Sequence, residues 1–253
     1  MYSKKLVGVL AVLGAAALVP VAGAQEVPTV EPQPLPAAIE ECRGLPADVV
    51  GTDASEVLFA LDNGGSVIVA KGGNDVIIGL NGDDTICAGD GRDVVIADRG
   101  DDTVFGDEGN DEIHAQGGKD KVHGGLDNDV VVGGPGDDTF LHGDNGRDRI
   151  FGEGGQDDLF GGDEGDKLRG GAGVDIMRGG QERDILEGQR GNDQLFGEDG
   201  DDDLLGGPGD DPRLHGDEGN DRLDGGAGSD EDCLGAEAVD DAPADVDVIQ
   251  NCE

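Results

Sequence analysis

The chain contains 253 residues, and its 58 acidic residues outnumber its 17 lysines and arginines to give a formal net charge of −41. Aromatic residues make up only 3% of the chain. Few aromatic residues combined with a large net charge are typical of disordered chains, because burial of so little apolar surface does not offset the entropy lost on ordering. The charge also excludes two classes of partner. No basic stripe is present that could displace counterions from nucleic acid, and anionic membrane surfaces would repel the chain. Cations are the partners that this composition favours.

Residues 1–24 have the pattern of a secretory signal peptide. Lys4 and Lys5 precede a mostly apolar run, which ends in an A-x-A cleavage site at Ala24. A membrane anchor is the alternative, but the run is short and ends in small residues. We therefore predict cleavage after Ala24 and a secreted, extracellular protein. No later segment resembles a membrane span, so membrane insertion is not expected.

Residues 25–41 are rich in proline, which prevents helix and sheet and favours an extended linker. Residues 42–69 contain apolar clusters that indicate short strands, and we expect an N-terminal cap of degenerate repeats there. Residues 234–253 are expected to form a C-terminal cap.

The four cysteines stand near the two ends of the region after the linker, and export would permit them to form disulfides. Three pairings are possible. Shorter loops cost less entropy to close, which favours Cys42–Cys87 and Cys233–Cys252. A zinc site is the alternative, but no C-x-x-C spacing is present.

From residue 70 to residue 233 the sequence repeats every nine residues, as in AKGGNDVII followed by GLNGDDTIC. The sixth position is Asp in all 18 units, the eighth is apolar in 17 and the fourth is Gly in 15. Random low complexity would not keep an aspartate and an aliphatic residue two positions apart through the whole array. The repeat therefore indicates an ordered working state.

One apolar residue in nine is the wrong period for a helix, whereas a glycine-rich turn followed by a three-residue strand fits it. We predict an all-β fold, a parallel β-roll or solenoid with two repeats per turn and a buried aliphatic column. Two units carry ten residues rather than nine. In the first, residues 133–142, we predict that His142 is the extra residue and that Phe140 enters the core; in the second, Pro212 marks the insertion.

Alternate units should place their aspartates on opposite edges of the roll, about 4.8 Å apart along each edge. Such close carboxylates repel unless a cation lies between them, and carboxylate and carbonyl oxygens are the ligands of calcium. Eight gaps on each edge give up to about 16 calcium sites. The predicted ligands on one edge are Asp75, Asp93, Asp111, Asp129, Asp148, Asp166, Asp184, Asp202 and Asp221, and those on the other are Asp84, Asp102, Asp120, Asp138, Asp157, Asp175, Asp193, Asp211 and Asp230.

The units resemble the GGxGxDxUx repeats of RTX-type parallel β-rolls, and the resemblance covers residues 70–233. In that family the loop aspartate and backbone carbonyls coordinate calcium between turns, which implies this role for the eighteen aspartates. The signal and the cysteine pairs are also similar to those of small secreted actinobacterial calcium-binding proteins. Asp127, Glu164 and Glu182 replace the fourth-position glycine, and Pro212 follows Asp211, so the sites beside them depart from the family pattern.

No catalytic motif is present, and adjacent carboxylates are expected in so acidic a chain. The four histidines, His114, His123, His142 and His215, stand at the ends of units and are expected to be solvated turn residues without a metal role. We predict a monomeric, non-enzymatic, extracellular calcium-binding protein with no protein partner indicated. The alternatives are the β-roll module of an extracellular hydrolase or adhesin, and a surface-matrix component.

Overall fold

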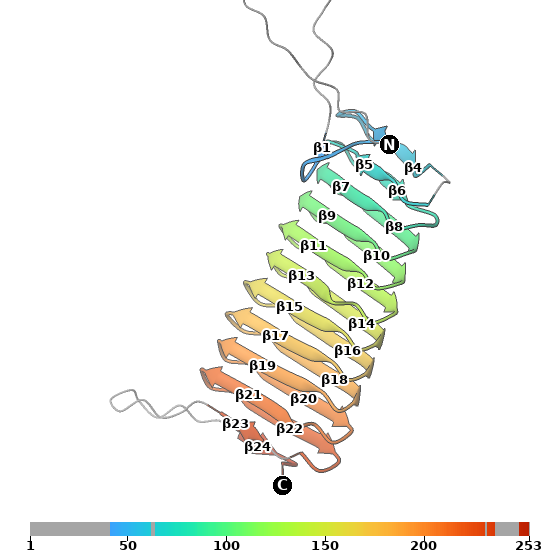
Figure 1. The fold of residues 1–253 in the computed structure, drawn as a ribbon. Coiled ribbons are helices and arrows are strands. Elements are labelled where there is room, and N and C mark those ends of the chain that lie inside the picture. Colours follow the sequence, from blue (N-terminus) through green and yellow to red (C-terminus); the bar gives the residue numbers. More distant parts are fainter. Residues whose placement is uncertain (1–40, 62–63, 231, 236–247, 253) are drawn as a thin grey trace, which may run out of the picture. The chain divides into compact units, whose positions relative to one another are not determined.

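The computed structural model describes residues 41–61, 64–230, 232–235 and 248–252. The predicted signal peptide and nearly all of the predicted linker lie outside these residues. Among the described residues, no helix is long and apolar enough to cross a membrane. The chain instead winds into a parallel β-solenoid of two stacked sheets, as predicted (Figure 1).

Each sheet has eleven strands within the described residues, and consecutive strands of the chain alternate between the two sheets. We call them the odd sheet and the even sheet. The odd sheet contains β3 (Val49–Val50), β5 (Val67–Val69), β7 (Thr85–Asp90), β9 (Thr103–Glu108), β11 (Lys121–Leu126), β13 (Phe140–Asn145), β15 (Asp158–Asp163), β17 (Ile176–Gln181), β19 (Gln194–Asp199), β21 (Arg213–Glu218) and β23 (Cys233–Leu234). The even sheet contains β4 (Val57–Phe59), β6 (Val76–Ile78), β8 (Val94–Arg99), β10 (Glu112–Gly117), β12 (Val130–Pro135), β14 (Arg149–Gly155), β16 (Lys167–Gly173), β18 (Ile185–Gly191), β20 (Asp203–Pro208), β22 (Arg222–Ala227) and β24 (Val248–Gln250).

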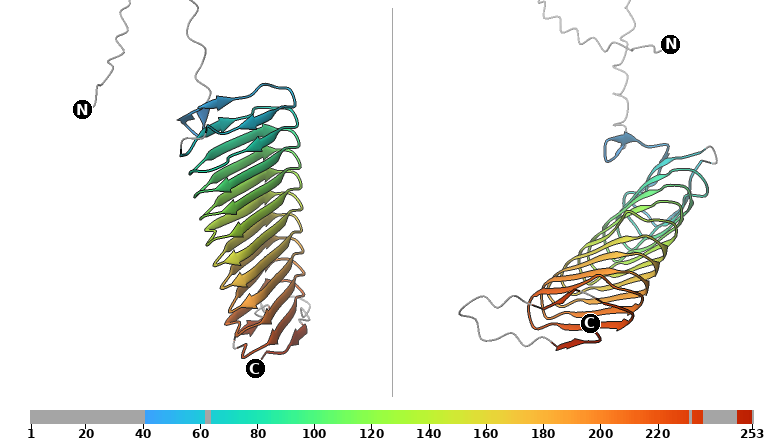
Figure 2. Two further views of the ribbon diagram at one scale, coloured as in Figure 1. Left: turned by 90° about the vertical axis from the view of Figure 1, so that its right-hand side faces the viewer. Right: turned by 60° about the horizontal axis from the view of Figure 1, so that its bottom comes forward.

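Two units make one turn, because a strand pairs in parallel with the strand two positions along the chain. Ile86 on β7 pairs with Val104 on β9, eighteen residues later, and Ile77 on β6 pairs with Val95 on β8. The two sheets face each other across the turns, and the loops lie along their edges (Figure 2). The degenerate N-terminal stretch continues the same pairing through β3, β4 and β5, preceded by the antiparallel pair β1 (Glu41–Cys42) and β2 (Leu45–Pro46).

The eighth-position aliphatic residues form the core, as expected, and they are fully buried from Ile68 to Leu223. The strands are longer than the three residues predicted. From β7 onward most span six, running from the seventh position of one unit into the third of the next. Because faces alternate along a strand, the first position of each unit also points inward. A second buried column of Gly and Ala, such as Ala88 and Ala97, follows from this.

The first ten-residue unit differs from the prediction in its register. Leu141, not Phe140, enters the core column, and it pairs with Val122 of β11. His142 therefore pairs with His123 at an ordinary outward position. The extra residue is Thr139, which lies between the loop aspartate and the strand and whose N–H donates to the Asp120 carbonyl at 3.3 Å.

The second ten-residue unit has the same construction, with Pro212 outside the strand and Leu214 in the core column. The last unit also shifts by one residue, so that Cys233 rather than Asp232 pairs with Leu214.

Candidate metal centre

The eighteen repeat aspartates lie where the sequence places them, in two ladders at the two edges of the solenoid. Every one of them is buried, with a relative exposure of at most 2%. Burial of so many carboxyl groups is costly unless each finds hydrogen bonds or a counter-charge. Their partners therefore determine what these edges can bind.

One oxygen of each carboxyl group is satisfied by the backbone of the preceding turn. The N–H of Asp75 donates to Oδ1 of Asp93 at 2.7 Å, and the N–H of Asp93 donates to Oδ1 of Asp111 at 2.8 Å. The same contact repeats along the whole of both ladders, at 2.7–3.0 Å, up to Asp221 on one edge and Asp230 on the other. These bonds fix each side chain and direct it along the stack.

The second oxygen accepts no hydrogen bond. In all eighteen aspartates the buried Oδ2 accepts no hydrogen bond from any described residue. A buried carboxylate oxygen without a partner costs on the order of 1–3 kcal/mol or more, and this structure repeats the defect at every loop. A regular array of unpartnered anionic oxygens indicates a site for cations.

The first-position glycines keep space beside these oxygens. A Cβ at Gly152 would lie 2.5 Å from Oδ2 of Asp157 and 2.6 Å from the carbonyl oxygen of Gly170 on the next turn. Gly124 shows the same contacts, at 2.5 Å to Oδ2 of Asp129 and 2.6 Å to the Gly143 carbonyl. At these two positions the carboxylate oxygen and the carbonyl oxygen therefore converge on the space beside the glycine. An all-oxygen set of this kind fits Ca²⁺.

Burial raises the pKa of most of the ladder carboxyl groups, because the charged form loses its hydration. The backbone hydrogen bond opposes the rise, and neighbouring carboxylates add to it. The pKa rises to about 6 for Asp93, Asp120, Asp148, Asp193 and Asp211, to about 7 for Asp102, Asp111, Asp138, Asp157, Asp175 and Asp202, and to about 8 for Asp129, Asp166 and Asp184. Without a cation, the aspartates with the highest pKa, Asp129, Asp166 and Asp184, thus keep a proton near neutral pH.

The three units that lack the fourth-position glycine still keep their aspartates in the ladder. Glu164 and Glu182 adopt φ of 74° and 66°, a left-handed conformation, where the glycines at equivalent places adopt wider angles such as 132° at Gly109. Their charges, with that of Asp127, contribute to the highest pKa values in the ladders. Each departure thus adds negative charge at one of these positions.

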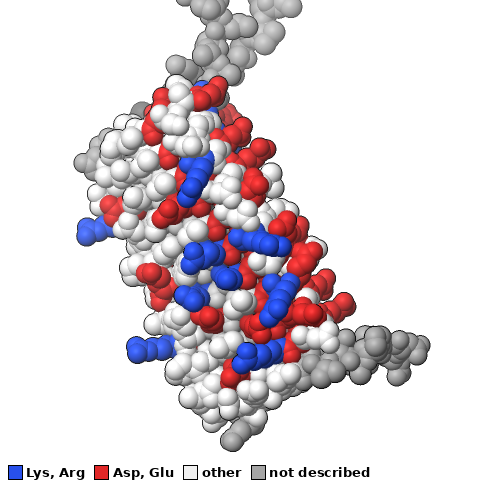
Figure 3. Space-filling view, turned by 180° about the vertical axis from the view of Figure 1, so that it is seen from behind, with Lys and Arg blue, Asp and Glu red and all other residues white. Residues whose placement is uncertain are grey.

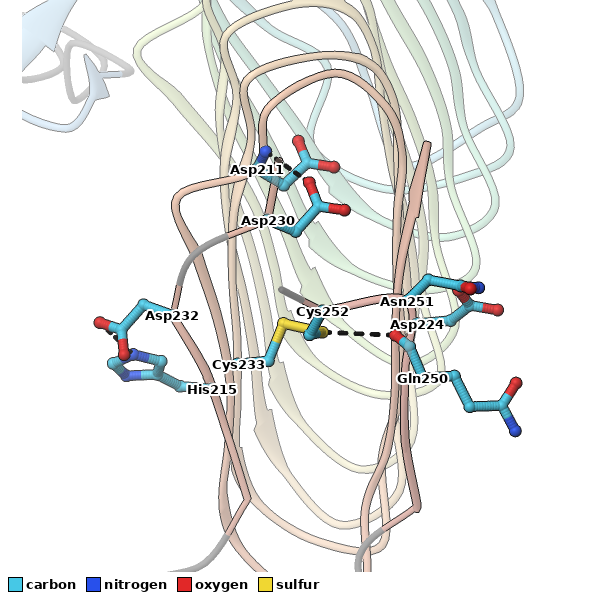
Figure 4. The surroundings of a disulfide bond; sticks show 9 residues. All are labelled: Asp211, His215, Asp224, Asp230, Asp232, Cys233, Gln250, Asn251 and Cys252. Atoms are coloured by element: carbon cyan, nitrogen blue, oxygen red, sulfur yellow. Dashed lines mark hydrogen bonds and ion pairs between the residues drawn. A yellow bond between two sulfur atoms is a disulfide. The ribbon is translucent and has the colours of Figure 1, made fainter. Parts of the chain in front are cut away.

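A disulfide lies at the C-terminal end of the solenoid, near the last aspartates of the ladder that ends at Asp230 (Figure 4). Cys233 bonds to Cys252, and Asp211 donates its N–H to Oδ1 of Asp230, the last aspartate of its ladder. The other predicted pairing, Cys42–Cys87, is also present and joins the β1–β2 pair to β7. Both predicted disulfides are therefore confirmed.

Several lysines and arginines lie on the face that Figure 3 shows, with acidic side chains among them. Residues eighteen apart stack on neighbouring strands, so that Arg149 of β14 pairs with Lys167 of β16. Acidic residues interleave with these bases: Arg169 contacts Glu187 at 2.7 Å. The expectation that nucleic acid is not a partner stays a prediction.

Two of the four histidines, His123 and His142, are not the solvated turn residues that the sequence suggested. His123 and His142 pair across β11 and β13, and both contact the carboxylate of Asp144. Burial alone would raise the pKa of Asp144, but hydrogen bonds from the two imidazoles outweigh it and hold that pKa well below its usual value. The sequence feature that could have revealed this pair is the separation of the two histidines, which equals two repeat units plus one inserted residue.

A parallel solenoid with two ladders of unpartnered carboxylate oxygens belongs to the class of repeat proteins that hold cations between their turns. The chain matches the RTX calcium-binding nonapeptide repeat family over residues 62–95, 88–122, 96–131, 105–140, 132–168, 157–186, 178–211 and 213–231. These matches cover more than half of the sequence, and the chain belongs to that family. No curated protein matches the chain.

Proposed function

We propose that this is a secreted calcium-binding protein whose two aspartate ladders hold Ca²⁺ between adjacent turns, and whose folding is coupled to extracellular calcium. The observation that carries the proposal is the array of buried Oδ2 atoms, in the ladder aspartates other than Asp221, that accept no hydrogen bond from the described residues. Membership of the calcium-binding repeat family supports the choice of metal.

The repeat aspartates would supply the side-chain oxygens, and the carbonyls of first-position glycines such as Gly143 and Gly170 would supply backbone oxygens. Bound calcium would provide positive charge where the fold itself offers none. The ladders contain sixteen aspartate-to-aspartate contacts between turns, so up to about 16 ions fit. Sixteen divalent ions would offset about 32 of the 41 net negative charges, which explains the acidity as ligand charge.

The biological role that we propose is binding rather than catalysis. The buried carboxyl groups lie in a periodic array, and no single pair differs from the others as a general acid and base would. The disulfides fit an oxidising compartment, which supports export by the predicted signal peptide and cleavage after Ala24. Similarity to small secreted actinobacterial proteins of this construction belongs to the same proposal, as does a monomeric state.

The test is a count of bound calcium by equilibrium dialysis, with one ladder aspartate altered. Asp166 lies between Asp148 and Asp184 in its ladder and so borders two gaps. Asp166→Asn keeps the shape of the side chain but removes its charge, and we expect the count to fall by about two ions. The matched control is Asp199→Asn on the exposed surface, which should leave the count unchanged. Equal counts for the wild type and Asp166→Asn would contradict the proposed ligand role.

A further inference from the structure

Two imidazoles and a carboxylate converge on the outer face of the odd sheet, away from the calcium ladders. The Nδ1 of His123 lies 3.1 Å from Oδ2 of Asp144, and the Nδ1 of His142 contacts the other oxygen of the same carboxylate. Each of the three residues offers one possible ligand atom, and these three atoms lie within 4.8 Å of one another. All three side chains are partly buried, with exposures of 34%, 25% and 27%.

The inserted residue Thr139 leaves this arrangement undisturbed. It lies before β13, so the strand keeps its ordinary register and His142 stands directly beside His123 on β11. Asp144 follows two residues after His142 and points to the same face. The three groups are thus fixed by the two strands on which they lie.

Aromatic rings hold the imidazoles in place. Phe105 stacks on His123 with ring centroids 5.2 Å apart, and Phe140 stacks on His142 at 5.3 Å with the rings nearly parallel. Phe160 contacts His142 from the following strand at 5.5 Å. Imidazoles held in this way lose little further freedom when they bind an ion, which favours binding.

We propose that His123, His142 and Asp144 form a site for a divalent transition-metal ion such as Zn²⁺, separate from the calcium ladders. Two imidazole nitrogens and one carboxylate oxygen are the ligand types of zinc and its neighbours, whereas calcium requires oxygen ligands. Bonds of about 2.0–2.1 Å in tetrahedral geometry place ligand atoms about 3.3 Å apart. The measured 3.1 Å between His123 Nδ1 and Asp144 Oδ2 is close to that separation. The three protein ligands leave a fourth position for water or another group.

Titration of the calcium-saturated protein with Zn²⁺ tests the site, followed by calorimetry and repeated with Co²⁺ to read the visible absorption of the bound ion. We expect one zinc ion per chain with calcium in excess, and a cobalt spectrum typical of nitrogen and oxygen ligands. His123→Phe should weaken zinc binding by at least about 100-fold, since loss of groups that merely support a ligand already costs 10–100-fold. Phe is the natural residue at the same register position in Phe105 and Phe160, so the sheet should tolerate it.

Asp144→Asn is a second variant, which keeps the side-chain shape and should weaken zinc binding to a similar extent. The matched control is His215→Phe. His215 occupies the same outward position on β21, beside Phe196, but pairs with no second histidine. This variant should bind zinc as the wild type does, and circular dichroism would confirm that all three variants are folded.

The proposal would be overturned if His123→Phe and Asp144→Asn bound zinc with the same stoichiometry and affinity as the wild type. The result is independent of the calcium proposal, because none of the three ligands belongs to a ladder. A failed calcium titration would appear in the circular dichroism spectrum, whereas a failed zinc site would appear only in the zinc and cobalt titrations.

Discussion

In calcium-free buffer, the solenoid should become more stable as the pH falls from about 8 to about 5. Fourteen of the ladder carboxyl groups, with an ordinary pKa near 3.8 in the unfolded chain, have their pKa raised by burial to about 6–8 in the fold. Both states are protonated well below pH 4, so burial carries no charge penalty there. Between about pH 4 and pH 8 the unfolded chain ionises these groups freely, whereas the fold must keep their protons or ionise them while buried, so stability falls across this range.

The magnitude follows from the number of protons that the fold holds at pH 7. The three groups with a pKa of about 8 hold nearly one proton each, the six at about 7 hold half a proton each, and the five at about 6 hold about a tenth each. The total is about six protons, while the unfolded chain holds almost none. The free energy of unfolding should therefore fall by on the order of 8 kcal/mol per pH unit near pH 7.

The assay is far-ultraviolet circular dichroism of calcium-stripped protein between about pH 5 and pH 8. Buffers should be freed of calcium beforehand, because soluble chelators lose affinity for calcium in acid. We expect β-structure at pH 5 and a steep loss before pH 8, while a calcium-saturated sample stays folded throughout. Calcium-free protein that is equally folded at both ends, or more folded at pH 8, would refute the reasoning.

Three further predictions follow from packing and metal chemistry. Gly155→Ala should destabilise the calcium-saturated protein by about 1–3 kcal/mol, because Gly155 adopts a φ of 149° and its Cβ would collide with the carbonyl oxygen of Gly136; Gly154→Ala, whose nearest neighbour lies 4.0 Å away, should be close to neutral in the same denaturant titration. Leu168→Ala opens a cavity in the core column and should cost about 2–5 kcal/mol in chemical unfolding, against about 0.5 kcal/mol or less for the exposed Leu205→Ala. Magnesium should not replace calcium in inducing β-structure, because it demands near-ideal octahedral geometry and gives up its water reluctantly; equal induction by both ions in dichroism titrations would argue against the site as described.

The period of the repeat was sufficient to predict the fold and the position of every ladder aspartate. Two units per turn place Asp75 and Asp93 on one edge and Asp84 on the other, whatever the loops contain. The disulfides followed from chain proximity. These features depend on spacing alone, which the sequence states directly.

Features that depend on the local register could not be predicted in the same way. The sequence TFLH offers two adjacent apolar residues for one inward position, and only the pairing with Val122 shows that Leu141 takes it. Once the register shifts by one residue, His142 moves from a bulge to a place beside His123. The histidine cluster was missed for that reason. The unpartnered Oδ2 atoms are likewise a matter of side-chain geometry, which a nine-residue pattern does not contain.

The most direct test of the central claim is a calcium titration of the chain from residue 25 onward at pH 7.5, starting from chelator, with circular dichroism and bound calcium measured on the same samples. We predict little β-structure in chelator, and a cooperative gain as calcium reaches the millimolar range, in step with the uptake of many ions per chain. A spectrum that is identical in chelator and in calcium, or β-structure that forms without uptake of calcium, would contradict the account.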